Sequence, residues 1–132
     1  MITKRSLSAL LLVLIAISFF PLGQQNAIAK SDDPIVVSMT FDGPLTPVWR
    51  TYLQRGIDQT VSQDAELLVI QLNTPGGAVD LMNSLVQQIL ACPVPVVVYV
   101  SPQGAMAASA GTLLVLAGDY AAISPDSVIG AA

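Results

Sequence analysis

The chain has 132 residues, which is about the length of one domain. Its residues are 53% hydrophobic and only 11% charged, a composition that excludes an intrinsically disordered protein. The formal net charge is -4, so general binding to nucleic-acid phosphates is not expected. One cysteine and no histidine are present. For this chain by itself, these counts exclude an intrachain disulfide, a cysteine zinc site, a Ser-His-Asp triad and a His-ligated metal site. We expect no cofactor and no metal.

The first 29 residues have the pattern of an export signal. Lys4 and Arg5 form a short basic start, an apolar stretch follows over residues 7–22, and Ala27-Ile28-Ala29 fits a cleavage site. We predict a secretory signal peptide at residues 1–29. The alternative is an uncleaved N-terminal membrane anchor, although the apolar stretch is shorter than the ~20 residues that a spanning helix needs. The remaining domain comprises residues 30–132.

Beyond this segment, predicted strands and helices alternate. Strands are indicated by short β-branched runs between turn signals, and helices by apolar residues at helical spacing. The strands are expected at residues 34–40, 66–72, 94–100, 120–124 and 128–129. The helices are expected at residues 47–62, with Thr46 as N-cap, and at 79–90 and 105–117. This order predicts crossover βαβ units in a mainly parallel α/β sheet, with strands 66–72 and 94–100 adjacent.

A glycine-rich corner, Asn73-Thr74-Pro75-Gly76-Gly77, separates strand 66–72 from helix 79–90. Ligands of open α/β sheets lie beyond the carboxyl ends of the strands. Backbone N–H groups at such a corner can bind an oxyanion, and glycine lets the backbone approach a substrate closely. Neither of the common phosphate-loop patterns is present. Taken alone, Pro75-Gly76-Gly77 favours an ordinary tight turn.

A second corner, residues 104–112, follows strand 94–100. Ser109 is surrounded there by alanine and glycine, which leave space for a substrate beside its hydroxyl. We expect Ser109 in the first turns of helix 105–117, where the helix dipole favours an alkoxide or oxyanion. The G-x-S-x-G pattern of a nucleophile elbow is absent. Taken alone, the small residues favour a surface for close helix–sheet packing.

The two corners together give a stronger indication than either one. Because they follow adjacent parallel strands, they are expected at the same edge of the sheet. A serine hydroxyl and glycine amides would then converge. A nucleophile and an oxyanion hole are the minimum requirement for acyl transfer.

The motifs T-P-G-G and A-A-S-A-G, at this spacing within residues 34–132, resemble those of the NfeD-type membrane serine proteases. This family belongs to the ClpP/crotonase superfamily, and the resemblance implies a ClpP-like α/β superhelix of ββα units. It assigns Ser109 as the nucleophile and the amides of Gly77 and Ala110 as the oxyanion hole. The resemblance also implies that Pro75 and Gly76 form the supporting turn. Many members carry a second serine three residues before the nucleophile, where this chain has Met106.

The resemblance also implies a Ser-Lys dyad whose lysine lies well downstream of the serine. No lysine follows Lys30 here, so the general base is absent from this chain. We therefore expect the N-terminal part of a protease domain, truncated at the C-terminus and inactive alone, or a decayed gene product.

The implied activity is that of an exported or membrane-associated endopeptidase on the extracytoplasmic side. It would cleave hydrophobic peptide segments of a membrane protein or a stomatin-like partner, and it would form a homo-oligomer. The alternatives are a non-catalytic ClpP-fold scaffold or oligomerisation module, and a crotonase-like acyl-CoA enzyme. An acyl-CoA enzyme would not need Ser109, and an export signal argues against a CoA substrate.

Overall fold

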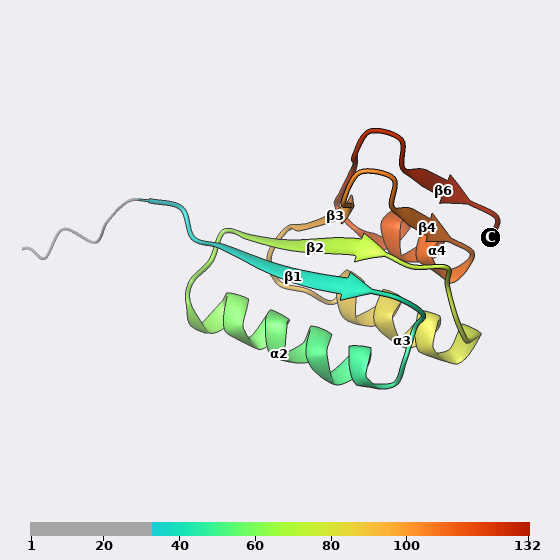
Figure 1. Ribbon diagram of the computed structural model, residues 1–132. Coiled ribbons are helices and arrows are strands. Elements are labelled where there is room, and N and C mark those ends of the chain that lie inside the picture. Colours follow the sequence, from blue (N-terminus) through green and yellow to red (C-terminus); the bar gives the residue numbers. More distant parts are fainter. Residues whose placement is uncertain (1–32) are drawn as a thin grey trace, which may run out of the picture. The chain divides into compact units, whose positions relative to one another are not determined.

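The computed structural model describes residues 33–132, which form one compact unit (Figure 1). The predicted signal segment, residues 1–29, lies outside the described residues. Within residues 33–132, no helix combines the length and the apolar character needed to cross a membrane.

Four parallel strands form the main sheet in the order β1-β2-β3-β5. They are β1 (Val36–Asp42), β2 (Leu67–Asn73), β3 (Val96–Val100) and β5 (Tyr120–Ile123). The predicted parallel pairing of strands 66–72 and 94–100 is confirmed, with Leu68 opposite Val96 and Leu72 opposite Val100. A second, two-stranded parallel sheet contains β4 (Met106–Ala108) and β6 (Val128–Gly130).

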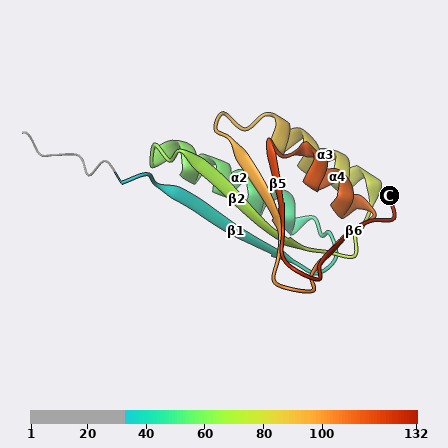
Figure 2. The same cartoon turned by 90° about the horizontal axis from the view of Figure 1, so that it is seen from above.

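Three helices lie on one face of the main sheet, as Figures 1 and 2 show. They are α2 (Val48–Ser62), α3 (Val79–Leu90) and α4 (Ala110–Ala117), and α3 contacts both of the others. Each strand turns alternate side chains toward the helices, as expected for a pleated sheet. In β1 these buried side chains are Val37, Met39 and Phe41. The alternate residues of β1 are exposed on the opposite face, which no helix of the described chain covers.

The core lies between the sheet and the helices. It is richest in β2 and β3, where Leu68, Leu72, Val96, Val98 and Val100 are fully buried. The nearly continuous apolar character of these two strands therefore reflects a central position between neighbouring strands. Helix α2 adds Trp49, whose ring meets that of Phe41 edge-on with centroids 4.8 Å apart.

Two local predictions are wrong. Helix 105–117 begins only at Ala110, because Met106–Ala108 is a strand that pairs with β6. Thr46 does not cap α2: the N-cap position belongs to Pro47, and no side-chain cap hydrogen bond forms. The Trp49 amide instead donates to the Thr46 carbonyl at 3.0 Å, which tightens the first turn. In both cases backbone pairing in the folded chain overrides the local residue preference.

Candidate active site

The structure brings the two glycine-rich corners together through backbone hydrogen bonds. The Thr74 amide donates to the Met106 carbonyl at 2.6 Å, and the Ala108 amide donates to the Thr74 carbonyl at 3.0 Å. The side chain of Asn73 adds a third contact, because its Oδ1 accepts from the Met106 amide at 3.0 Å. The chain immediately after β2 is thus joined to β4, directly before Ser109.

Ser109 occupies a sharp strand-to-helix turn between β4 and α4. Its φ of 51° and ψ of -120° lie in a region that non-glycine residues rarely adopt, which costs on the order of 1–3 kcal/mol. The residue is exposed, and it stands immediately before α4 rather than in the first helical turn. A serine on a strained turn between a strand and a helix has the geometry of a nucleophile elbow.

The sequence does not match the G-x-S-x-G pattern of an elbow, because alanine stands at position 107, two residues before Ser109, where the pattern requires glycine. Ala107 is fully buried. A Cβ atom on Gly111, two residues after Ser109, would lie 2.5 Å from Thr74 Cγ2. Both positions therefore require small side chains. A pattern that accepts alanine or glycine two residues before and two residues after a serine would have found the elbow in the sequence.

The two glycines of the first corner have different surroundings. Gly76 is buried with φ +105°, and an added Cβ would lie 2.9 Å from both Ser109 Cβ and the Ala108 carbonyl oxygen. Gly77 is exposed, and its added Cβ would lie 2.6 Å from Leu45 Cβ. Gly76 is thus packed directly against the serine, whereas Gly77 packs against the loop between β1 and α2.

The backbone amides of Gly77 and Ala110 have no acceptor within residues 33–132, and the same holds for the neighbouring amides of Ala78 and Gly111. Unpaired amides are the rule in the first turn of a helix. The amide of Ser109 is engaged, because it donates to the Gly130 carbonyl of β6 at 2.9 Å. The Thr112 hydroxyl lies 3.0 Å from the same Gly130 oxygen. Strand β6 therefore holds the elbow in place and leaves the first amide of α4 free. The assignment of Gly77 and Ala110 as an oxyanion hole stays a prediction.

No general base for Ser109 is found in the described part of the chain, which contains no lysine and no histidine. The nearest acids in sequence are engaged elsewhere. Asp119 Oδ2 accepts from the Val96 amide at 2.8 Å, and Asp126 Oδ2 accepts from Gln103 Nε2 at 2.7 Å. Lys30 lies outside the described residues. The same 100-residue region, 33–132, has no group of three or more His, Cys, Asp or Glu side chains that could hold a metal ion.

Comparison with known proteins identifies the family. The family model described as "NfeD1b, N-terminal domain" matches residues 36–132. The chain belongs to this NfeD family. Among curated proteins it is 39% identical over 97 residues to the membrane-bound protease PH1510 of Pyrococcus horikoshii, and the match covers 74% of this chain and 22% of that protein.

The solved structures agree. The 1510-N membrane protease of Pyrococcus horikoshii, described as specific for a stomatin homolog, is 39% identical with a TM-score of 0.70. The match covers 74% of this chain and 49% of that one. A mutant of 1510-N in which a lysine is replaced by alanine was solved with a substrate peptide, and it gives 38% identity and a TM-score of 0.71.

ClpP1 from Listeria monocytogenes is similar in fold at 20% identity, with a TM-score of 0.55 over 61% of this chain and 46% of that one. The predicted ClpP-like α/β fold is thereby confirmed. The NfeD chain spans about a fifth of the length of the curated protease, and about half of the solved chains.

Proposed function

We propose that this NfeD chain carries the nucleophile and the oxyanion hole of a serine endopeptidase of the Ser-Lys type. The observation that carries the proposal is the strained elbow of Ser109, packed against Gly76 and followed by the unpaired amide of Ala110. A strained, exposed serine beside free backbone amides suits attack on a carbonyl carbon. Neither a packing surface nor an ordinary turn requires a serine in this conformation.

In the proposed reaction, Ser109 Oγ attacks the carbonyl carbon of the peptide bond while its proton passes to a base. The amides of Gly77 and Ala110 stabilise the negative charge that develops on the carbonyl oxygen. The C–N bond then breaks, and the leaving amine takes the proton from the base. Water hydrolyses the acyl-enzyme and regenerates the serine. A lysine kept neutral by burial could serve as the base.

The substrate and setting are proposed from the relatives. PH1510 is a membrane-bound protease, and 1510-N is described as specific for a stomatin homolog. We infer hydrophobic peptide segments of a stomatin-like membrane protein as the substrate. The predicted signal peptide supports a membrane-associated site on the extracytoplasmic side. Apolar side chains exposed on β5 and β6, such as Tyr120 and Val128, support contact with further protein. We propose a second copy of the chain as one such contact, in keeping with the expected homo-oligomer.

The test compares this chain with a longer chain that supplies a downstream lysine. A fluorogenic peptide with a hydrophobic segment is the substrate. Because the weakly nucleophilic hydroxyl needs a base, the 132-residue chain alone is expected to be inactive. The longer chain should cleave the peptide, and Ser109→Ala should reduce cleavage at least about a thousandfold.

Ser62→Ala is the matched control, because Ser62 is an exposed serine at the end of α2. It should leave the cleavage rate unchanged. Cleavage by the longer chain that survives Ser109→Ala would contradict the proposed nucleophile. A longer chain without any peptidase activity would favour a non-catalytic scaffold.

A further inference from the structure

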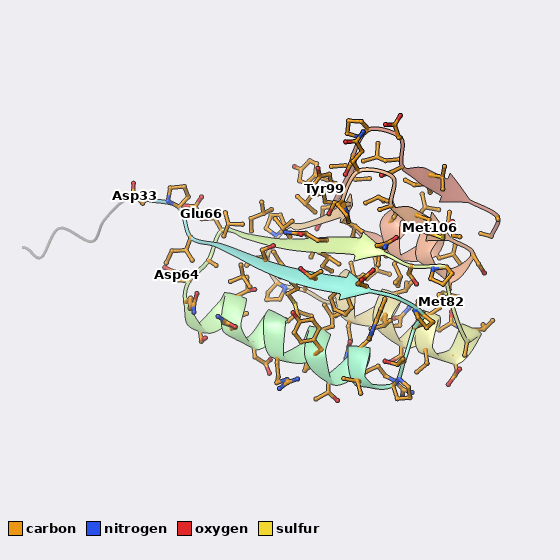
Figure 3. All side chains as sticks on the ribbon, in the orientation of Figure 1. Asp33, Asp64, Glu66, Met82, Tyr99 and Met106 are labelled. Atoms are coloured by element: carbon orange, nitrogen blue, oxygen red, sulfur yellow. The ribbon has the colours of Figure 1, made fainter. Side chains whose placement is uncertain are left out.

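A cleft of about 660 Å³ lies on the face of the main sheet that the helices leave open. Its walls come from the carboxyl-terminal ends of three adjacent strands and from the loops that follow β3 and β5. Figure 3 shows Tyr99 on this face, away from α2 and α3. None of Ser109, Gly76 and Gly77 lines the cleft, so it is distinct from the candidate active site.

The side-chain amides in the lining have their nitrogen atoms engaged. Gln103 Nε2 donates to Asp126 Oδ2 at 2.7 Å, and Gln71 Nε2 donates to Ser38 Oγ at 3.0 Å. Neither glutamine Oε1 has a partner within residues 33–132. The lining thus offers carbonyl oxygens as free hydrogen-bond acceptors.

Asp42 is the one charged residue in the lining. Its Oδ1 accepts from Asn73 Nδ2 at 2.8 Å, and its second oxygen has no partner within residues 33–132. Asn73 Oδ1 also accepts from the Met106 amide, so the Asn73 side chain is fixed at both of its polar atoms. Asn73 in turn fixes the position of the Asp42 carboxylate. Both arginines of the described chain belong to α2, and neither lines the cleft. The local charge is therefore negative and uncompensated.

A buried hydroxyl and an aromatic ring complete the wall of the cleft. Ser101 lies in the lining and is only 8% exposed, yet its Oγ has no hydrogen-bond partner in the described structure. The Oγ atom itself is enclosed, so the hydroxyl makes this wall polar but is not a group that a ligand in the cleft contacts. The half-buried ring of Tyr99 gives the same wall an aromatic surface.

We propose that this cleft binds an organic cation, a primary ammonium group on a short apolar stem. The carboxylate of Asp42 and the free oxygens of Gln71 and Gln103 would accept hydrogen bonds from the ammonium. The ring of Tyr99 would attract the charge through its π-face and pack against the stem. The volume lies within the usual range of small-molecule sites, and a single carboxylate is a poor ligand set for a divalent metal ion.

Such a group occurs both in free diamines and in lysine side chains of peptides, so the test has two arms. The full chain is titrated with cadaverine and with N-acetyl-lysine methylamide, and binding is followed by amide NMR. Pentanol and the corresponding norleucine derivative serve as uncharged analogues. We expect shifts at Gln71, Tyr99 and Gln103 with the amines and none with the analogues. Tighter binding of cadaverine would identify a free diamine as the ligand, and tighter binding of the lysine derivative would identify a lysine side chain of a peptide.

The matched variants are Asp42→Asn, which keeps the acceptor for Asn73, and Asp33→Asn, which changes the net charge equally outside the cleft. Asp42→Asn should weaken amine binding about fivefold, and Asp33→Asn less than twofold. Added salt should weaken binding to the wild-type chain. Equal effects of the two variants, or amine-induced shifts that spare the cleft residues, would overturn the proposal.

Discussion

Replacement of Gly76 by alanine tests the contact between the two corners most directly. The new Cβ would lie 2.9 Å from Ser109 Cβ and 2.9 Å from the Ala108 carbonyl oxygen. Because one of these atoms belongs to the backbone, a shift in a flexible side chain cannot relieve the overlap. Overpacking of this kind costs about 1–3 kcal/mol. The φ of +105° adds about 1–2 kcal/mol for a residue with a Cβ.

Gly43→Ala is the matched control. Gly43 has a similar φ of +93°, but nothing lies within 4 Å of its added Cβ. Gly43→Ala should therefore lose only the stability that a positive φ costs a residue with a Cβ. Gly76→Ala should lose the overpacking energy in addition, so the unfolding free energies of the two variants should differ by about 1–3 kcal/mol. In a domain of this size, each kcal/mol of that difference lowers the Tm of Gly76→Ala below the Tm of Gly43→Ala by about 4–8 °C.

The measurement is urea denaturation followed by the fluorescence of Trp49, the single tryptophan of the chain, which is buried in the core. The slope of the free energy against urea should stay constant, because both variants expose the same surface on unfolding. Equal destabilisation by Gly76→Ala and Gly43→Ala would refute the close packing of Gly76 against Ser109.

Two further predictions concern the elbow and the N-terminus. Ser109→Gly should be about 1 kcal/mol more stable than Ser109→Ala in urea denaturation, because glycine adopts the φ of +51° without strain; equal stability would mean that the turn stores no strain. N-terminal sequencing of the exported protein should give Lys30 as the first residue, since Ala27-Ile28-Ala29 fits a cleavage site, and a protein that retains Met1 would instead support the anchor alternative.

Elements with a strong local signal were predictable from the sequence. Helix α3 begins and ends at the predicted residues, because Val79–Leu90 lies between a glycine corner and a proline-rich segment. The central strands β2 and β3 were located to within two residues at each end, since continuous apolar runs are typical of buried parallel strands. The position of the two glycine-rich corners at the same edge of the sheet was also predictable, because these strands are parallel and adjacent.

The short strand β4 could not be predicted in the same way. Alanine-rich residues 105–108 continue naturally into a helix by intrinsic preference. They are extended in the structure because Thr74 exchanges backbone hydrogen bonds with Met106 and Ala108, and because β6 pairs on the other side. These partners lie about 20 to 35 residues away in sequence, so no local pattern reports them.

The sequence by itself determined the fold class and the family, and it predicted Ser109 as the nucleophile, because hydrophobic periodicity and two short motifs are local properties of the chain. Only the tertiary structure decided how that serine is held. The positive-φ turn of Ser109 depends on the Gly130 carbonyl, which accepts a hydrogen bond from its amide. It also depends on Gly76 and Gly111, because a side chain at either position would overlap with Ser109 or with Thr74. The open cleft at Asp42 and Tyr99 depends likewise on strand register, which places residues from separate strands side by side on one face of the sheet.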